Sequence, residues 1–297
     1  MEEQHIETQK KSWHDKHYKT LLIIPLSLII FSFIYLGIFY SQHNDIMFKD
    51  ISLTGGTSVT LNDNLINSED LRNFLQNRLE EMTLKEISDL ATGEKVAIII
   101  ETKTDAETTK GLLEGYLNYE LTDENSSIEF TGSSLSTSFY KQLLIAILVS
   151  FVFMSIVVFF LFKTPIPAGA VIFSAFANIL MTLVAVNILG IKMSSAGIIS
   201  LLMLIGYSVD SDILLTNRLL RRHEGTVNEK ISGAFKTGIT MTLTSLIAIT
   251  LAFFVVNSFS SVLSQIFTIL IIGLIFDILN TWITNVSILK WYLERKK

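Results

Sequence analysis

The chain has 297 residues, of which 49% are hydrophobic and 17% charged, and its formal net charge is −5. Soluble globular domains carry about 25% charged residues, so this composition indicates a membrane protein. Cysteine is absent, which excludes a disulfide framework, a thiolate metal site and a cysteine nucleophile.

Six apolar runs are long enough to cross a bilayer, which takes about 20 consecutive apolar residues as a helix. No small-residue cleavage site follows the first run, so we expect it to stay in place as a membrane anchor. The six predicted spans are Leu21–Phe39, Leu143–Phe162, Ala168–Leu189, Ser195–Asn217, Ile239–Val256 and Val262–Leu289.

The distribution of Lys and Arg predicts the orientation of these spans, because cytoplasmic loops carry an excess of both residues. With both termini inside, 14 Lys and Arg residues near the span ends are cytoplasmic, and Lys192 is the one in a short outer connection. We therefore expect a multi-pass protein of the cytoplasmic membrane with both termini cytoplasmic.

The predicted fold class is a multi-pass α-helical membrane protein with six transmembrane helices and an extracytoplasmic α+β ferredoxin-like domain between helices 1 and 2. The expected parts are a cytoplasmic N-terminal segment (1–20), transmembrane helix 1 (21–40), the outer domain (41–142), a five-helix transmembrane domain (143–290) and a cytoplasmic tail (291–297).

The outer segment Ser41–Gln142 holds 18 acidic and 8 basic residues, which is typical of a solvated surface. Its pattern predicts the order β-α-β-β-α-β of a ferredoxin-like unit. The expected elements are a strand at Ile51–Leu61, a helix from Asn67 to Met82, a hairpin of Leu84–Leu90 and Lys95–Thr102, a helix at Asp105–Tyr119 and a strand at Ser127–Thr131.

Two adjacent glycines, Gly55 and Gly56, interrupt the first of these strands. Glycine adopts a positive φ at low cost and lets a strand bend. We expect the pair to act as a hinge where the anchor helix joins the sheet. In a later loop, Asn125-Ser126-Ser127 forms a glycosylation sequon, which is a weak signal alone.

Three carboxylates lie inside predicted spans: Asp210 and Asp212 in the fourth, and Asp277 in the sixth. An ionised Asp near the bilayer centre costs roughly 2.5–3.5 kcal/mol, so such residues usually have a function. We predict a proton relay of these three residues. An Asp that stays protonated and fixes helix packing is the structural alternative.

Helix geometry separates the two carboxylates of the fourth span, because two residues correspond to about 200° of rotation. Asp210 is expected to lie deeper, at the level of Asp277, and to be the main relay residue. Asp212 shares the opposite face with Ser208 and Thr216. It is expected nearer the cytoplasmic surface, where it could pair with Arg218.

Several neutral polar residues fall at similar depths in neighbouring spans, and in lipid each must find a partner. We predict that they form a polar network that supports the carboxylates. The predicted members are Asn178 in the third span, Thr240 and Thr244 in the fifth, and Asn280 in the sixth. The five histidines have no metal-ligand spacing, and no cofactor motif is present, so we expect neither a metal nor a cofactor.

Three segments together resemble the SecF proteins of the SecD/SecF family, which is related to the RND transporters. They are Leu53-Thr54-Gly55-Gly56-Thr57, the fourth-span motif Gly206–Arg218 and the Thr-rich segment Lys236–Ser245. Two departures make the chain similar to archaeal members. Bacterial members usually have Asn-Asp where this chain has Asp210-Ser211, and an Arg where it has Thr237, so a carboxylate–arginine switch is not carried over.

The resemblance implies a non-enzymatic subunit that assists Sec-dependent protein translocation, coupled to proton movement. Its implied partners are a SecD-like subunit, the Sec translocon, the unfolded exported polypeptide and membrane lipids, with no nucleic acid. The alternatives are an RND-type exporter subunit for small molecules or lipids, and a non-conducting scaffold for SecD. An intramembrane aspartyl protease is a more distant alternative, because the chain lacks a Gly-x-Gly-Asp element.

Overall fold

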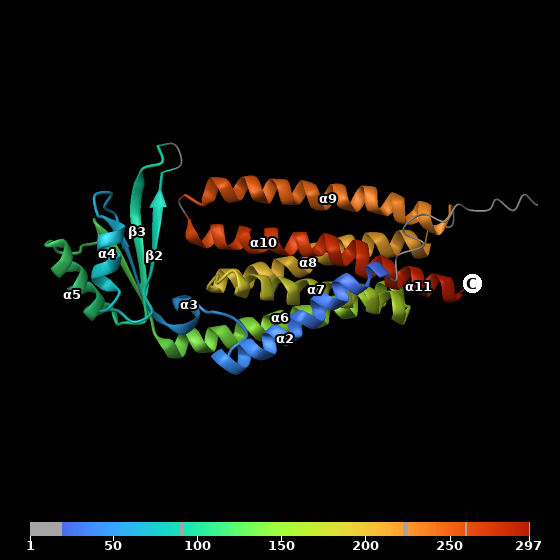
Figure 1. Ribbon diagram of the computed structural model, residues 1–297, viewed down its shortest axis with the longest axis horizontal. Coiled ribbons are helices and arrows are strands. Elements are labelled where there is room, and N and C mark those ends of the chain that lie inside the picture. The colour runs from blue at the N-terminus through green and yellow to red at the C-terminus, as the bar shows by residue number, and fades with distance from the viewer. Residues whose placement is uncertain (1–19, 90–91, 222–224, 259, 297) are drawn as a thin grey trace, which may run out of the picture.

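The computed structural model describes residues 20–89, 92–221, 225–258 and 260–296. Within them it contains six helices that are long and apolar enough to cross a membrane, and a small sheet domain at one end of the helical bundle (Figure 1). The long helices are α2 (Ile23–His43), α6 (Ser133–Phe162), α7 (Pro165–Ile188), α8 (Ser195–Arg221), α9 (Val227–Val256) and the continuous segment Ser261–Arg295. The six predicted spans are confirmed.

The last span is not one regular helix. It consists of α10 (Ser261–Leu279), a π-helical segment η1 (Asn280–Asn285) and α11 (Val286–Lys296). A π-helix closes its hydrogen bonds at i→i+5 and is rare, occurring often at functional sites. The hydropathy pattern alone did not predict it.

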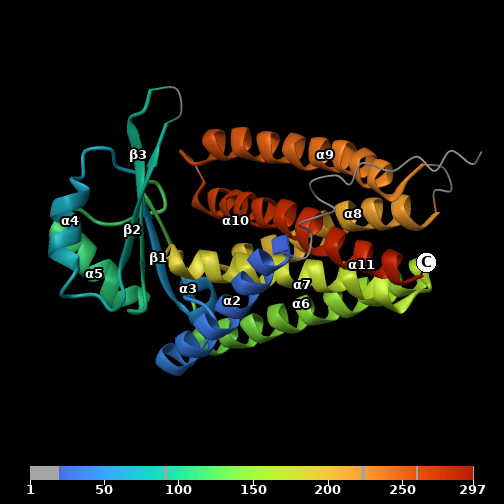
Figure 2. The same cartoon turned by 45° about the vertical axis from the view of Figure 1, so that its right-hand side comes forward.

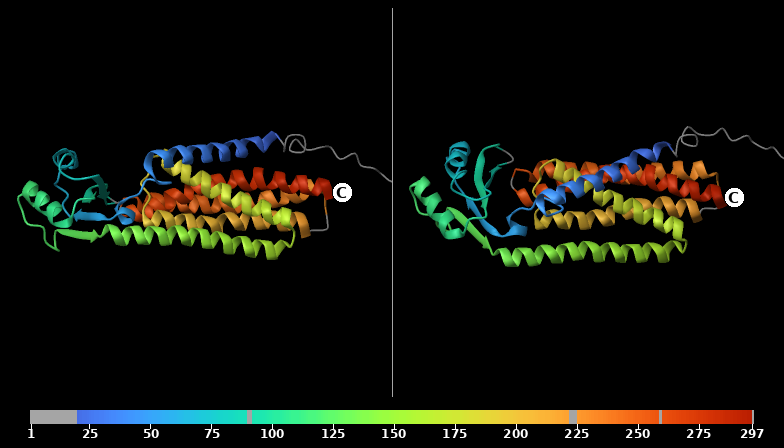
Figure 3. Two further views of the ribbon diagram at one scale, coloured as in Figure 1. Left: turned by 90° about the horizontal axis from the view of Figure 1, so that it is seen from below. Right: turned by 60° about the horizontal axis from the view of Figure 1, so that its bottom comes forward.

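The six helices differ in how much of their surface the chain itself covers. In the most apolar windows of α7 and α8, 67% and 56% of the residues are buried, against 11% in α6 and in α9. The centre of the bundle therefore lies at α7, α8 and α10, while α6 and α9 lie at its edges (Figures 1 and 3). Polar residues on the inward faces of the central helices are therefore shielded from lipid.

The outer domain is a four-stranded antiparallel sheet of β1 (Gly56–Leu61), β2 (Thr83–Ser88), β3 (Lys95–Thr102) and β4 (Ser126–Thr131) in the order β2-β3-β1-β4. Helices α4 (Ser68–Leu75) and α5 (Ala106–Leu117) cover the face away from the bundle (Figure 2). The predicted β-α-β-β-α-β order is confirmed.

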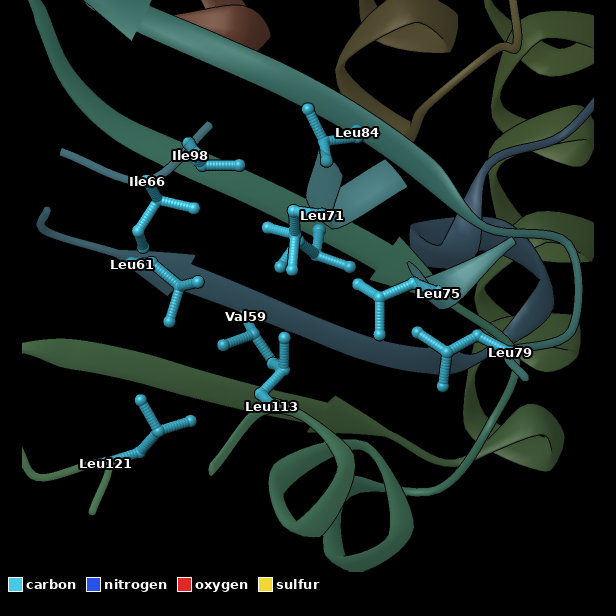
Figure 4. Close-up of a cluster of buried hydrophobic side chains, with 11 residues drawn as sticks. Val59, Leu61, Ile66, Leu71, Leu75, Leu79, Leu84, Ile98, Leu113 and Leu121 are labelled. Atoms are coloured by element: carbon cyan, nitrogen blue, oxygen red, sulfur yellow. The ribbon is translucent and has the colours of Figure 1, made fainter. Parts of the chain in front are cut away.

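Side chains from strands and helices together form the core of this domain (Figure 4). Val59 and Ile98 of the sheet are fully buried against Leu71 and Leu75 of α4 and Leu113 of α5. The side-chain oxygens of Asn67 and Asp105 cap the N-termini of α4 and α5. Local capping signals and the apolar faces of the helices therefore specify the same structure.

The predicted strand at Ile51–Leu61 is wrong in its first half. Residues Ile51–Thr54 form a helical turn, α3, capped by the Asp50 side chain, and β1 begins only at Gly56. Gly55 and Gly56 have φ values of 85° and 144°. A Cβ at Gly55 would lie 2.5 Å from the Ser133 Cα, and one at Gly56 would lie 2.3 Å from the Thr102 carbonyl oxygen. Hinge motion at this packed junction stays a prediction.

The outer domain and the bundle are joined by backbone hydrogen bonds as well as by the chain connections. The Asp50 N–H donates to the Met193 carbonyl (3.0 Å), and the Met193 N–H donates to the Phe48 carbonyl (2.7 Å). The Ser195 N–H at the start of α8 donates to the Ser52 hydroxyl (2.9 Å). The N-terminal end of α8 is therefore tied to the base of the outer domain.

A cavity of about 480 Å³ lies beside this junction, between the sheet and the adjacent ends of α8 and α10, and Asp50 lines it. Burial raises the pKa of the Asp50 carboxyl above its ordinary value. Hydrogen bonds from the Ser52 side chain and N–H oppose this shift, while the nearby Glu101 carboxylate adds to it.

Candidate functional site

Three helices each present a row of buried polar side chains to a common interior. In each row the residues recur about every four positions, so they share one helix face. The rows are Ser174 and Asn178 on α7, Ser208, Asp212 and Thr216 on α8, and Asp277, Thr281 and Asn285 on α10 and η1, and all eight residues are at most 1% exposed. We call this set the polar cluster.

Asp212 has two hydrogen-bond donors in the cluster. The Asn285 amide donates to its Oδ1 at 2.7 Å, and the Ser174 hydroxyl donates to the same oxygen at 3.3 Å. The other oxygen, Oδ2, is buried and has no hydrogen-bond partner among the described residues. Two donors thus fix Oδ1 of the carboxylate, and the Thr281 side chain also lies beside the group.

Asp277 lies near enough to Asp212 for the two carboxyl groups to interact electrostatically. The Thr281 side chain lies beside both, and Ser208 lies beside Asp277. The two carboxyl groups therefore share one polar environment, although they come from different helices. Two ionised carboxylates so placed repel each other strongly at low dielectric.

The π-helical segment η1 brings its own polar residues into the cluster. Thr281, Thr284 and Asn285 are fully buried, and the Thr284 hydroxyl donates to the Asn280 amide oxygen at 3.2 Å. The wider π-helical geometry orients these three side chains toward α7 and α8. Trp282 packs on α9, where a Cβ at Gly238 would lie 2.4 Å from its ring.

Glycine also lets α8 and α10 approach closely beside the carboxylates. A Cβ at Gly273 would lie 2.4 Å from the nearest methyl carbon of Leu204, which is fully buried. Apolar side chains close the cluster at both ends. Ile198, Leu201 and Ile269 lie toward the outer domain, and Leu219, Val286 and Leu289 lie toward the other end of the bundle.

Asp212, and not the predicted main relay residue Asp210, is the fourth-span carboxylate that is buried with Asp277. Asp210 is exposed on the surface of α8, on the same face as Met203 and Tyr207, whereas Asp212 is fully buried next to Asp277. The two side chains do point in opposite directions, as the helix geometry predicted. The sequence does indicate which face of α8 is buried, because Ser208, Asp212 and Thr216 form a continuous polar row along it.

The predicted pairing of Asp212 with Arg218 is also wrong. Arg218 donates instead to the carbonyl of Gly233 and, at 2.9 Å, to the Thr237 hydroxyl. It therefore joins the end of α8 to the beginning of α9, at a distance from the carboxylates along the helix. The Arg218 side chain reaches the threonine that stands where bacterial relatives were expected to carry Arg.

The predicted supporting residues divide into two groups. Asn178 and Asn280 are fully buried and belong to the interior. Thr240 and Thr244 are exposed on α9, and each donates its hydroxyl to the carbonyl four residues earlier, at 2.7 Å. Thr242 is the residue of this series that faces inward, and its hydroxyl lies 3.4 Å from that of Ser211.

Sequence reasoning missed Ser174, Thr281 and Asn285 as neighbours of the carboxylates. Ser and Thr are common in transmembrane helices, so Ser174 and Thr281 carry no distinctive signal alone. Asn285 did carry a signal, because it follows Thr281 by four positions and Asp277 by eight, the spacing of one helix face. The enclosed cluster can hold a proton or a small cation, since it combines two carboxyl groups with neutral oxygen donors.

Comparison with known proteins identifies relatives along the whole chain. A family model described as "Protein export membrane protein SecD/SecF, C-terminal" matches residues 116–295. The chain is 38% identical to the protein-export membrane protein SecF of Methanocaldococcus jannaschii, covering 94% of this chain and 96% of the relative. It is 36% identical to the SecF of Methanothermobacter thermautotrophicus, covering 94% of each.

The fold is similar to a crystal structure of SecDF from Thermus thermophilus, which is described as a translocon-associated membrane protein. The TM-score is 0.73 at 19% identity, and the match covers 97% of this chain and 39% of that chain. This likeness concerns the fold alone, and the chain spans about two fifths of the SecDF polypeptide. Because the archaeal relatives exceed 30% identity over nearly their full length, the chain belongs to the SecF family of protein-export membrane proteins.

Proposed function

We propose that the chain is a SecF-like subunit that works with a SecD-like subunit beside the Sec translocon and assists export of unfolded polypeptides. It lies in the cytoplasmic membrane with both termini cytoplasmic and the sheet domain outside. Proton movement through the intramembrane carboxylates supplies the driving force. Membrane lipids cover the remaining apolar surface of the helices.

The buried pair Asp212 and Asp277 is the observation that supports this coupling best. A carboxyl group in a membrane interior is costly, and such groups commonly mark proton relays or ion pathways. A purely structural network would pair its polar atoms, yet Oδ2 of Asp212 and Oδ1 of Asp277 have no hydrogen-bond partner among the described residues. A site that loads and unloads an ion needs such free atoms.

The exposed face of α8 supports the proposed partner. Asp210 lies on this face within a membrane span, where lipid offers it no partner. Its neighbours Met203 and Tyr207 are 42% and 38% exposed. A second transmembrane subunit that covers this face would shield the Asp210 carboxyl group, and a relay between subunits could pass through it.

The junction at the start of α8 supports a mechanical link to the outer domain. Asp212 lies on α8, and the Ser195 N–H at the start of the same helix is bonded to Ser52 of α3. A change in helix position on ion binding would therefore move the base of the outer domain. We infer that this motion acts on the emerging polypeptide.

The proposal is tested by export of a reporter protein into vesicles that contain the translocon, the SecD-like subunit and this chain. With an imposed proton gradient, Asp212→Asn and Asp277→Asn should each reduce gradient-stimulated export by about tenfold or more, as expected when an essential proton carrier is lost. Thr244→Val is the matched control, because its exposed hydroxyl bonds only to its own helix.

If both Asn variants keep full gradient stimulation at equal protein levels, the carboxylates carry no coupling ion and the chain serves as a scaffold. If export without a gradient also falls to the level seen without the chain, the variant subunit no longer supports export at all, for example because it no longer folds or assembles. Copurification with the SecD-like subunit separates this outcome from a specific loss of coupling.

A further inference from the structure

The chain contains two copies of the Asn-x-Ser/Thr sequence that N-glycosylating enzymes recognise, Asn125-Ser126-Ser127 and Asn285-Val286-Ser287. The structure distinguishes the two. Asn285 is fully buried, and its amide donates to Oδ1 of Asp212 inside the polar cluster. Asn125 is partly exposed, in the loop that leads from α5 into β4. Of the two, Asn125 alone can therefore carry a bulky polar group.

A tight turn holds the Asn125 side chain through both ends of its amide group. Its Oδ1 accepts from the Thr122 N–H at 2.8 Å, and its Nδ2 donates to the Glu120 carbonyl at 3.0 Å. The Ser126 N–H closes the turn by donating to the Thr122 carbonyl at 2.9 Å. A side-chain amide nitrogen carries two hydrogens, and a linked sugar replaces one of them. The modified side chain can therefore keep both hydrogen bonds of the turn.

The edge of the sheet leaves room for a sugar beside this turn. Strand β4 is the last strand in the order β2-β3-β1-β4, and within the described residues no strand pairs with its outer side. Ser127 and Glu129 of this strand are exposed, and Phe130 is 59% exposed. An unpaired strand edge of this kind invites pairing with other chains. A bulky hydrophilic group at the end of β4 that lies away from α6 would hinder such pairing.

The chain between this turn and the membrane is long enough for transfer at the membrane surface. Strand β4 and residues 133–142 of α6 separate Asn125 from Leu143, where the second predicted span begins. At about 3.3 Å per strand residue and 1.5 Å per helical residue, they amount to roughly 35 Å of chain. This length is several times the depth of the headgroup layer. The Asn125 amide can therefore stand clear of the lipid.

We propose that Asn125 carries an N-linked oligosaccharide, transferred on the outer side of the membrane from an oligosaccharide that is linked to a lipid phosphate. In this transfer a bond forms between Nδ2 of Asn125 and the first carbon of the sugar, and the bond from that carbon to the phosphate oxygen breaks. The amide nitrogen releases one proton, the lipid phosphate leaves, and nothing is oxidised or reduced. The inference rests on the proposed function in one respect, the position of the sheet domain outside the membrane.

The modification is measured on the full-length chain, purified from the membranes of the cells that naturally make it and analysed by mass spectrometry of its peptides. We expect the peptide with Asn125 to carry an added sugar mass in most copies of the chain. The peptide with Asn285 should carry none, and it serves as an internal control because Asn285 is buried. Sugar-specific fragment ions identify the added group as an oligosaccharide.

The electrophoretic mobility of variants identifies the residue that carries the sugar. Asn125→Gln and Ser127→Ala should each abolish the mobility shift, because the recognised sequence needs both the amide and the hydroxyl two residues later. Ser127→Thr keeps that hydroxyl and should keep the shift. Neither change at position 127 removes a hydrogen bond of the Asn125 turn. Asn77→Gln, an exposed Asn of another turn outside such a sequence, is the matched control and should keep the shift.

The inference is overturned if the Asn125 peptide of the wild type is unmodified. It is also overturned if the shift survives Asn125→Gln, which would place the sugar on another residue. Because the chain has no cysteine, Glu107→Cys on the exposed surface of α5 reports the position of the sheet domain through a maleimide that cannot cross membranes. If intact cells are labelled but Asn125 is unmodified, the inference alone fails. If labelling requires lysis, the proposed orientation fails with it.

Discussion

Asp50 joins the outer domain to the membrane bundle, and its ionisation should affect the stability of that junction. Its Oδ1 accepts hydrogen bonds from the Ser52 N–H at 2.9 Å and the Ser52 hydroxyl at 2.7 Å, while burial raises the pKa of the carboxyl group. The folded protein therefore binds this proton more tightly than the unfolded chain does. Asp50 then destabilises the fold as pH rises from its ordinary pKa through the raised one.

Asp50→Asn should remove this dependence while keeping an oxygen that can accept from Ser52. We expect the variant to gain stability relative to the wild type as pH rises through that window, and the difference to be constant above it. Melting temperatures of both proteins at a series of pH values check this. A difference that does not change with pH would mean that burial does not perturb Asp50.

The paired glycines allow a second test at single positions. Gly55→Ala and Gly56→Ala should each destabilise the protein by roughly 1–3 kcal/mol, because each combines a positive φ with a backbone clash. Gly93→Ala is the matched control, since Gly93 has a φ of 70° but no atom within 4 Å of an added Cβ. Chemical denaturation should show a clearly smaller loss for Gly93→Ala.

At the scale of elements, the close approach of α8 and α10 is predicted to hold the two carboxylates together. Gly273→Ala should push Leu204 aside and cost about 1–3 kcal/mol of stability. Leu204→Ala alone should cost about 2–5 kcal/mol through the cavity it leaves. In the double variant the new methyl group occupies part of that cavity, so the combined loss should be smaller than the sum.

Denaturation of the two single variants and the double variant gives the coupling energy between positions 204 and 273. Additive losses would contradict direct packing of the two helices at this level.

The sequence predicts where the helices and strands lie better than it predicts which side of each helix is buried. Hydropathy summed over about 20 residues identified the six spans, and capping and periodicity identified the order of the outer domain. The side of α8 that is buried depends on which helices pack against it, and that is tertiary information. Asp210 was therefore predicted to be the main relay residue, although the polar row of Ser208, Asp212 and Thr216 favoured Asp212.

The π-helical segment and the turn α3 were missed for a related reason. η1 has no strong local signal and α3 has only its N-cap residue Asp50, and both also depend on tertiary contacts. η1 places Thr281 and Asn285 against Asp212, and α3 is held by Asp50 and by the contact between Ser52 and Ser195. Local propensity gives way to tertiary packing at such positions.

At the scale of the whole molecule, the chain leaves part of its transmembrane surface uncovered, including a carboxyl group. Only 11% of the residues are buried in the most apolar windows of α6 and α9, and α8 exposes Asp210. Lipid can cover the apolar faces of α6 and α9, but it cannot satisfy a carboxyl group. The face of α8 is therefore where we expect the SecD-like subunit.

Whether the chain is one half of such a complex is tested most directly by site-specific crosslinking from α8. The chain has no cysteine, so Met203→Cys provides a single attachment point for a photoreactive reagent, and Ile275→Cys on α10 provides an exposed control. We predict a crosslink to the SecD-like subunit from position 203 and none from position 275. Equal labelling from both positions, or no crosslinked subunit from either, would contradict the proposed complex.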